Sequence, residues 1–369
     1  MKSEEIRIAV IGCGRISGHH CRSIVAAEGI ELVAACDLVE SKAEAYGKEF
    51  SVPYFVNYRE MFKALPQINT VVVATPSGMH YEHTTEIMRL YNKNVIVEKP
   101  TFMRPSQLVE AYSLADQLGL HIFPVFQNRY NLAVKRVHQA LSNGELGDIR
   151  IMSVRVRWCR PQRYYNLAPW RGTYAQDGGA LTNQGIHHVD LLRYLGGDVQ
   201  RVNAVMRTLG AEIEVEDTVV ATMAYSKGSV GVLEVTTAAR PDDFEASISL
   251  VCEKGLAQIG GIAVNELQIF TPDPSACMAH SEDFSGNVYG HGHEFMYRDI
   301  SAFFNQNIPY PVERTDCLNT IKLLHSFYCS DELGMWVDVE SEKESVRLGR
   351  PDESLANLYR TPLSGGSVG

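Results

Sequence analysis

The sequence predicts an α/β domain built on a doubly wound parallel sheet, followed by an α+β domain with a large, open, mainly antiparallel sheet. Short apolar segments alternate with amphipathic ones through about residue 125, as in strand–helix–strand units. Beyond that point the expected strands are longer and alternate apolar with polar residues, which is typical of a sheet with one covered face. Because 369 residues exceed one ordinary core, we expect domains at 1–125 and 126–369.

Six short apolar segments are the expected strands of the first domain. Amphipathic stretches fill the gaps between them, and the clearest helices are expected at 79–91 and 105–118. Strands that alternate with helices in this way pair in parallel. The expected strands are Arg7–Ile11, Glu31–Cys36, a weak Tyr54–Val56, Thr70–Ala74, Asn94–Val97 and His121–Val125.

The second domain is expected to begin with a helix at 133–143 that Gly144 closes. Further helices are expected at 183–195 and 294–305, and the charged tail after Leu333 is expected to be rich in turns, with 364–369 disordered. The expected strands are Arg150–Trp158, Thr218–Tyr225, Ser229–Thr236 and Glu245–Cys252.

Composition excludes several classes of function. A net charge of −10 argues against nucleic-acid binding, because a phosphate backbone requires a basic face. No window is long and apolar enough for a membrane helix, and the N-terminal segment is expected to be a strand rather than a signal peptide. The eight scattered cysteines form no CxxC pair, which favours reduced thiols and hence the cytoplasm.

Two glycines follow the first expected strand and precede a helix. Gly12 permits a tight turn, and Gly14 lets backbone N–H groups approach a pyrophosphate at the helix N-terminus. Asp37, at the end of the second strand, would accept a hydrogen bond from a ribose hydroxyl and repel a 2′-phosphate. The pattern therefore predicts a Rossmann domain that binds NAD rather than NADP, with Thr75 and Pro76 on the same sheet edge.

Several further motifs occur in one consistent order. They are Ala74-Thr-Pro76 followed by His80, Val97-Glu-Lys-Pro100, Gln127-Asn-Arg-Tyr130, Trp170-Arg171 and the segment Gly178–His187. With them the chain resembles the Gfo/Idh/MocA family of sugar and polyol dehydrogenases from Ile6 to about Phe304. Within that family, Arg157–Tyr165 and Asn183–Asp190 resemble UDP-N-acetylglucosaminuronate 3-dehydrogenases of the WlbA/WbpB type.

The resemblance implies a cofactor site and a pair of catalytic groups. Oxidation of a secondary alcohol needs a hydride acceptor and a base for the hydroxyl proton. Lys99 is the expected hydrogen-bonding or deprotonating group, and it is expected to meet His187 at the sugar hydroxyl. The family has Asp where this chain has Asn183. An amide cannot stabilise a protonated His187 by charge, so Lys99 rather than His187 is favoured as the group that transfers the proton. The cofactor-binding residues expected are Gly12, Gly14, Arg15, Ile16, Asp37, Thr75, Pro76, His80, Glu98, Lys99 and Gln127.

Substrate specificity is expected to depend on a segment rich in arginine and aromatic residues. Guanidinium groups suit phosphate and carboxylate, and aromatic faces suit a base or a sugar. Arg155 and Arg157 alternate along a strand, so we expect them to cover a sheet face. The substrate-binding residues expected are Lys99, Arg129, Arg160, Arg163, Tyr164, Tyr165, Asn183 and His187.

Two other polar clusters are assigned no chemistry at this stage. His291-Gly-His293-Glu294 has metal-ligand residue types but lies in a loop, and no metal is expected; His188 is expected to be structural. The acidic run 212–217 is expected to be a solvated turn.

The leading hypothesis is an NAD-dependent dehydrogenase for a UDP-linked sugar acid in surface-polysaccharide synthesis. Similar proteins imply a homodimer or homotetramer, and in some a 2-oxo acid recycles the cofactor. A dehydrogenase for free inositol or a monosaccharide would use Lys99 and His187 equally well, but it leaves the arginine-rich segment without a ligand. A non-catalytic NAD-sensing regulator is the third reading, which Asn183 keeps open.

Overall fold

The computed structural model describes residues 5–284, 289–341 and 343–362. It forms two compact units. Unit 1 takes in the chain up to Val125, the return segment His293–Arg314 and the chain from Pro351, whereas unit 2 takes in Phe126–Gly292 and Thr315–Arg350. The expected division at residue 125 therefore has a counterpart here, but two segments expected in the second domain pack with unit 1.

Unit 1 is built on a six-stranded sheet in the order β3-β2-β1-β4-β5-β6, and all of its strand pairs are parallel. The order reverses between β1 and β4, which creates the edge where doubly wound sheets bind ligands. The central strands are buried on both faces, as continuous apolar runs require. The strands are β1 (Ile6–Ile11), β2 (Ile30–Cys36), β3 (Tyr54–Phe55), β4 (Thr70–Val73), β5 (Asn94–Val97) and β6 (Ile122–Pro124).

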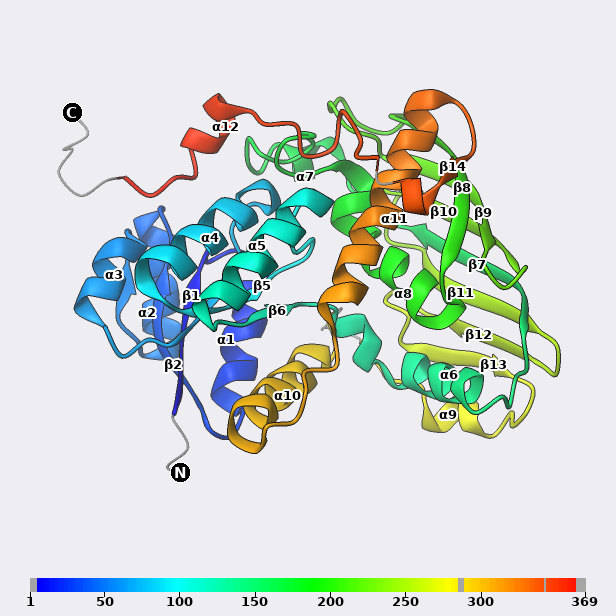
Figure 1. Cartoon of the computed structure of the whole chain (residues 1–369), viewed down its shortest axis with the longest axis horizontal. Coiled ribbons are helices and arrows are strands. Elements are labelled where there is room, and N and C mark those ends of the chain that lie inside the picture. Colours follow the sequence, from blue (N-terminus) through cyan, green and yellow to red (C-terminus); the bar gives the residue numbers. More distant parts are fainter. Residues whose placement is uncertain (1–4, 285–288, 342, 363–369) are drawn as a thin grey trace. The chain divides into compact units, whose positions relative to one another are not determined.

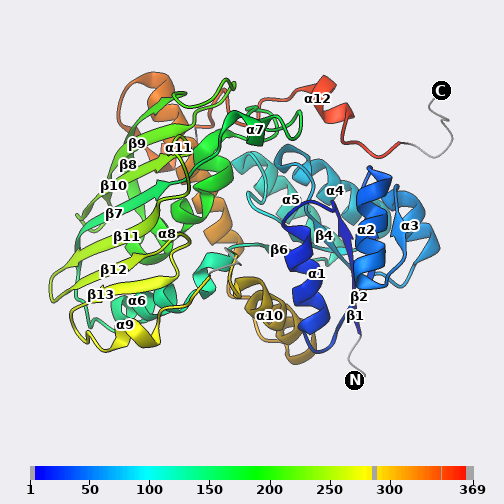
Figure 2. The same ribbon diagram turned by 180° about the vertical axis from the view of Figure 1, so that it is seen from behind.

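Helices cover both faces of this sheet. Those that follow β1 and β2 lie on the face seen in Figure 2, and those that flank β5 lie on the face seen in Figure 1. The tail is joined to unit 1 by an ion pair of 2.7 Å between Arg360 and Glu82. The helices are α1 (Ser17–Ala26), α2 (Glu40–Phe50), α3 (Tyr58–Ala64), η1 (Ser77–Met79), α4 (His80–Tyr91), α5 (Pro105–Leu118), α10 (Gly292–Gln306) and α12 (Glu353–Asn357).

Unit 2 contains an eight-stranded sheet in the order β13-β12-β11-β7-β10-β9-β8-β14. Its pairs are antiparallel except that β10 and β7 run parallel. The strands are β7 (Ile149–Arg157), β8 (Val199–Arg207), β9 (Thr218–Tyr225), β10 (Val230–Thr236), β11 (Glu245–Cys252), β12 (Leu256–Gly260), β13 (Glu266–Phe270) and β14 (Val337–Asp338).

One face of this sheet packs against helices, and the other is exposed. Along β10, buried and accessible residues alternate, so the strand presents Leu233 inward and Val232 outward. Figure 2 shows the sheet with its flanking helices. The helices of unit 2 are η2 (Gln127–Tyr130), α6 (Leu132–Ser142), α7 (Gln162–Tyr165), η3 (Ala180–Gln184), α8 (Ile186–Gly196), α9 (Ala276–Ala279), α11 (Arg314–Leu333, which begins at the last residue of unit 1) and η4 (Val339–Ser341).

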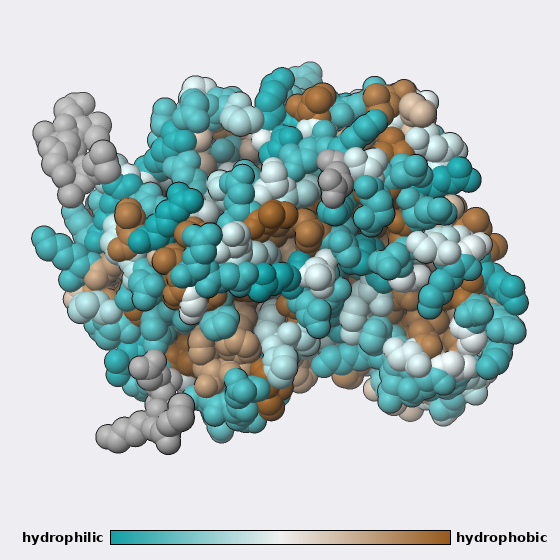
Figure 3. Space-filling model, viewed as in Figure 1, coloured by the Kyte–Doolittle hydropathy of each residue, from teal (hydrophilic) through white to brown (hydrophobic). Residues whose placement is uncertain are grey.

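The surface drawn in Figure 3 is mostly hydrophilic, with hydrophobic residues in separated patches. Within the described part of the chain, no helix combines the length and apolar character needed to cross a membrane. The predicted disorder at 364–369 lies outside the described residues.

Candidate active site

The glycine loop between β1 and α1 has the geometry of a phosphate-binding turn. Gly12 has φ +93°, and a Cβ there would lie 2.4 Å from the carbonyl oxygen of Ala74, so only glycine fits. Gly14 is exposed, and a Cβ added to it would meet no atom within 4 Å. Ser17 is the first residue of α1, and its hydroxyl donates to the Gly12 carbonyl at 2.5 Å. Open space therefore borders the backbone beside the N-terminus of α1, as a diphosphate requires.

Asp37 directly follows β2 and holds this loop through two hydrogen bonds. One carboxylate oxygen accepts the N–H of Cys13 at 2.8 Å, and the other accepts the N–H of Val39 at 2.8 Å. The side chain is partly exposed, so its remaining lone pairs can accept ribose hydroxyls. Together with the space beside Gly14, this geometry fits a dinucleotide whose ribose lacks a 2′-phosphate.

Thr75 and Pro76 follow β4 at the same sheet edge and are partly exposed. His80 was expected to touch the cofactor, but it is 1% exposed. Its ring nitrogens lie 2.8 Å from the carbonyl oxygen of Pro100 and 2.9 Å from that of Thr75. Burial is the largest influence and lowers the pKa of His80. This histidine therefore joins the loops after β4 and β5 from inside the unit.

Glu98 and Lys99 follow β5 and differ sharply in environment. Glu98 is 4% exposed, and one carboxylate oxygen lies 2.9 Å from Nε2 of His20 and 3.6 Å from Nε2 of His293. Its other oxygen accepts the backbone N–H of Lys99 at 3.0 Å. Burial favours the neutral acid, but the hydrogen bond from His20 and the nearby His293 ring hold the pKa of Glu98 well below its usual value. Glu98 thus anchors the strand end from within, whereas Lys99 is partly exposed.

The same interior cluster contains the residue types of a metal site. The ligand atoms of His20, Glu98 and His293 all lie within 4.8 Å of one another and are buried. The hydroxyl of Tyr297 lies 2.7 Å from Nδ1 of His20 and fixes the ring from its other side. Of the His291–Glu294 tract, only His293 belongs to this group. The hydrogen bonds account for Glu98 and His20 as a network that supports the strand end.

In unit 2, Asn183 and His187 lie on consecutive helical segments. The segment η3 is a π-helical turn in which the N–H of Gly185 donates to the carbonyl of Ala180 at 2.8 Å. Such turns are rare and occur often at functional sites. The Asn183 amide donates to the carboxylate of Asp177, whose other oxygen accepts the N–H of Gly172 at 2.7 Å. A carboxylate therefore stands beside residue 183 although that residue is itself an amide.

His187 is 7% exposed at the start of α8. Its Nε2 lies 3.1 Å from the side-chain nitrogen of Gln127 in η2. Gln127 was expected to bind the cofactor; within unit 2 the structure places it against this imidazole. The neighbouring His188 is fully buried beside Trp158 and its pKa is lowered to about 4 by burial, in keeping with the structural role expected for it.

A second group of unit 2 side chains surrounds the hydroxyl of Tyr164. Gln184 donates to it at 3.1 Å, and Nη1 of Arg171 also contacts it. The Arg171 guanidinium stacks on Tyr164 and Trp170, 4.3 and 4.5 Å from the two ring centroids. Its buried Nε has no hydrogen-bond partner among the described residues. Neither Arg171 nor Gln184 was among the predicted substrate-binding residues, although Arg171 ends the arginine-rich segment.

Of the other residues expected to bind substrate, Arg160 and Arg163 are accessible to solvent, whereas Tyr165 is buried. Arg163 is exposed on α7. Arg160 pairs with Asp243 at 2.8 Å and lies over the Trp158 ring. Tyr165 is buried, and its hydroxyl lies 3.0 Å from that of Thr237. Tyr165 therefore packs within unit 2, and we do not retain it as a ligand contact.

Arg129 was also expected to bind substrate, but the structure engages it fully inside unit 2. Its guanidinium pairs with Asp190 at 2.6 Å and with Asp316 at 2.9 Å, and it is 6% exposed. It also lies 4.5 Å from the centroid of Tyr194. This buried guanidinium donates to two carboxylates and so joins η2, α8 and α11, which is a structural role within unit 2.

The acidic run 212–217 differs from the solvated turn that was expected. Glu212 and Glu214 are exposed, but Glu216 and Asp217 are 2% and 1% exposed. Asp217 accepts the N–H groups of Leu209 and Gly210 at 2.9 and 2.6 Å. No pattern of polarity distinguishes the buried carboxylates of this run from the exposed ones. The expectation for Arg155 and Arg157 agrees better, because Arg157 pairs with Glu234 on the accessible sheet face.

The parallel sheet with its glycine loop and Asp37 defines an oxidoreductase with an NAD-binding Rossmann domain. The chain belongs to the GFO/IDH/MocA family. Residues 6–126 match the domain described as oxidoreductase family, NAD-binding Rossmann fold, and residues 134–258 match the GFO/IDH/MocA C-terminal domain. NAD is accordingly the cofactor of this protein.

Three related proteins illustrate the similarity. The WlbA dehydrogenase from Bordetella pertussis, in complex with NADH and UDP-GlcNAcA, is 33% identical with a TM-score of 0.86, and the match covers 92% of this chain and 99% of that one. The D-glucoside 3-dehydrogenase of Escherichia coli is 28% identical over 64% of this chain and 72% of its own length. An uncharacterized oxidoreductase of Synechocystis is 29% identical over 57% of each chain.

Proposed function

We propose that this protein is an NAD-dependent dehydrogenase that oxidises the 3-hydroxyl of UDP-N-acetylglucosaminuronate to a ketone. The observation that carries the substrate class is the arginine–tyrosine group of unit 2. The Arg171 guanidinium lies 4.3 and 4.5 Å from the ring centroids of Tyr164 and Trp170, and the residue is partly exposed. An oriented guanidinium of this kind suits a phosphate or a carboxylate, and a free neutral sugar would leave it unsatisfied. The similarity to WlbA spans 92% of the chain and supports the same substrate.

The chemistry requires little of the protein beyond binding and proton transfer. Bound NAD supplies the hydride acceptor. We assign Lys99 to hydrogen-bond the reacting hydroxyl and accept its proton. It follows the carboxyl end of β5, at the sheet edge where we expect NAD to bind, and it is partly exposed. His187 serves as a second acid or base, oriented by Gln127. Asn183, backed by Asp177, orients the sugar ring.

The proposal extends to assembly and setting. The accessible face of the unit 2 sheet exposes Ile151, Val205, Val220, Val230 and Val232, each at least 41% exposed, and apolar patches of this kind favour self-association. We propose a homodimer or homotetramer through this face. We further propose that it is a cytoplasmic enzyme of nucleotide-sugar synthesis for surface polysaccharide, with a 2-oxo acid as the agent that recycles NADH.

A second candidate is a 3-dehydrogenase for simple glucosides. It is favoured by the 28% identity to the D-glucoside 3-dehydrogenase of Escherichia coli, a protein whose name also specifies position 3. The same Lys99 and His187 would serve it, so the two candidates differ only in what the Arg171 group binds.

A substrate panel separates the candidates. NADH formation is measured with UDP-N-acetylglucosaminuronate, UDP-N-acetylglucosamine, free N-acetylglucosaminuronate, a glucoside and myo-inositol. We expect turnover of the UDP-linked acid, lost in Lys99→Ala and retained in Lys93→Ala, a partly exposed lysine at the opposite end of β5. Turnover of the glucoside alone would replace the proposal with the second candidate, and NAD binding without any turnover would favour a regulator.

A further inference from the structure

Glu216 is a buried carboxyl group that the proposed chemistry does not use. It is 2% exposed and lies just before β9. One side-chain oxygen accepts the N–H of Leu181 at 3.1 Å and the hydroxyl of Tyr328 at 2.7 Å. Its backbone carbonyl accepts the N–H of Ala180 at 2.9 Å. Glu216 therefore binds both N–H groups that open η3, the turn that carries Asn183.

The glycine before η3 is matched to this carboxyl group. Gly179 has φ +83°, and a Cβ there would lie 2.2 Å from the second carboxyl oxygen of Glu216. Any larger residue at 179 would have to displace a buried side chain, which packing at this density does not allow cheaply. The backbone of 178–181 is thus held against Glu216 by the hydrogen bonds from the N–H groups of Ala180 and Leu181 and by the close approach of Gly179 to its carboxyl group.

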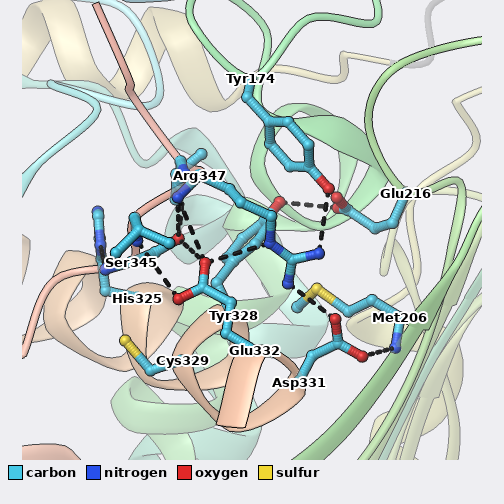
Figure 4. Close-up of polar contacts among 12 residues, drawn as sticks. Tyr174, Met206, Glu216, His325, Tyr328, Cys329, Asp331, Glu332, Ser345 and Arg347 are labelled. Carbon is cyan, nitrogen blue, oxygen red and sulfur yellow. Dashed lines mark hydrogen bonds and ion pairs between the residues drawn. The ribbon is translucent and has the colours of Figure 1, made fainter.

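Tyr328 joins the same point to helix α11. Its hydroxyl lies 2.9 Å from that of Thr182 and also contacts the carbonyl oxygen of Gly178. Figure 4 shows Tyr328 and Glu216 in contact, with Arg347 and Tyr174 beside them. The turn is consequently held from two elements: the run before β9 contacts it through Glu216, and α11 contacts it through Tyr328.

The charged groups around Glu216 leave it without a bonded cation in the described part of the chain. Arg347 is the nearest guanidinium, but it pairs with Asp331 and Glu332 of α11 and contacts the Tyr174 hydroxyl. The segment 178–184 itself contributes no titratable side chain. Burial dominates and raises the pKa of Glu216 to about 8, and Tyr328, the backbone amides and Arg347 oppose the shift only in part.

We propose that Glu216 is a positioning residue for the dehydrogenase reaction: through its contacts with Leu181 and Tyr328 it fixes the turn that presents Asn183 and leads into His187. The inference rests on the proposed function for its catalytic readout. Glu216 is 2% exposed, and it would act through the segment 178–184 that its hydrogen bonds hold. Ionisation would place an uncompensated charge in the interior, which the segment can relieve only by moving.

The experiment compares Glu216→Gln, Glu216→Ala and the control Glu212→Gln. Glutamine keeps an acceptor for Leu181 and Tyr328 without an ionisable group, alanine removes both contacts, and Glu212 is an exposed residue of the same run. We expect wild type and Glu212→Gln to lose kcat above about pH 8, the pKa of Glu216. Glu216→Gln should keep kcat within about threefold at neutral pH and retain it at higher pH.

Glu216→Ala should lose about 10- to 100-fold in kcat, the scale of a misplaced catalytic group, with NAD affinity unchanged in a fluorescence titration. Wild-type kcat in Glu216→Ala, or an unchanged alkaline decline in Glu216→Gln, would overturn the proposal. Amide hydrogen exchange of peptides covering 178–187 gives a readout that needs no substrate. Exchange there should rise in Glu216→Ala and stay at the wild-type level in Glu216→Gln. If the wild type turns over none of the panel, the proposed function fails while exchange still decides the role of Glu216.

Discussion

The side-chain nitrogen of Gln127 lies 3.1 Å from Nε2 of His187, and both belong to unit 2. An amide N–H donates in this arrangement, so Nε2 accepts and the proton of a neutral ring resides on Nδ1. The contact joins η2 to the first turn of α8. It also fixes the tautomer of neutral His187, the residue to which we assign proton transfer.

Replacing Gln127 with leucine should therefore lower kcat by about 100-fold, the lower end of what one acid–base contribution supplies, with little change in the dissociation constant for NAD. Steady-state kinetics and a cofactor titration measure the two quantities. An effect confined to NAD affinity would instead restore the cofactor-binding role that the sequence suggested for Gln127.

Asp37 should control the choice of cofactor. Asp37→Asn keeps the size of the side chain but removes its charge. The hydrogen bond to the ribose of NAD is then weaker, so KM for NAD should rise by about 10- to 100-fold, as for a lost charge-assisted hydrogen bond. The charge that repels the 2′-phosphate of NADP is lost as well. The ratio of kcat/KM for NAD to that for NADP should fall. Glu40→Gln, an exposed residue at the start of α2, is the matched control; an unchanged ratio in Asp37→Asn would contradict the assignment.

Arg171 should govern affinity for the nucleotide sugar. Arg171→Lys keeps the charge but loses the planar group that stacks on Tyr164 and Trp170. We expect KM for UDP-N-acetylglucosaminuronate to rise by about tenfold or more, on the scale of one charged hydrogen bond, with NAD affinity unchanged. Arg155→Lys on the accessible sheet face serves as the control, and equal effects of the two substitutions would remove Arg171 from the substrate site.

The ion pair of Arg129 should matter for stability rather than binding. Arg129→Ala leaves the buried Asp190 without its cation, which costs about 3–5 kcal/mol in the free energy of unfolding. Arg314→Ala breaks an exposed pair with Asp116 and should cost only about 0–1 kcal/mol. Urea denaturation measures both. A stable Arg129→Ala with raised substrate KM would reinstate the ligand role.

Glu216 should also give the folded state a pH dependence. Its pKa rises from 4.5 in the unfolded chain to about 8 in the folded one, so its contribution is fully present below about pH 4.5 and is lost as pH rises to about 8. Glu216→Gln has no such proton to lose. Relative to wild type, the variant should therefore gain unfolding free energy between pH 5 and pH 8, and a constant difference across that range would contradict the shifted pKa.

The strand–helix alternation of unit 1 was predictable because parallel strands buried on both faces are apolar along their whole length. β5 matches its expected bounds, and β1 and β2 differ by one residue. Helix α11 was missed because it is buried on nearly all sides from Leu323 to Ser330, so it has no polar face to reveal a helical period. Strands β8, β12 and β13 were missed as well, although β8 pairs with β9 and β12 pairs with β13, which are neighbours along the chain.

The site was predictable where local geometry dictates residue type. Gly12 and Asp37 stand where the glycine pattern placed them, because a tight turn and a strand end are local features. Arg129 and Glu216 could not be assigned, because their roles depend on partners far along the chain. Asp190 and Asp316 satisfy the first, and Tyr328 meets the second. Charge and polarity alone do not tell a buried ion pair from a ligand contact.

The return of the chain to unit 1 has a practical consequence for anyone who wishes to study the nucleotide-binding half in isolation. A gene fragment that stops at Val125 would lack His293 and Tyr297 of α10, which support the interior of that half through Glu98 and His20. It would also lack Arg360, which clamps α4 through Glu82. A self-sufficient fragment must join three stretches of sequence, with α10 and the C-terminal tail grafted behind β6.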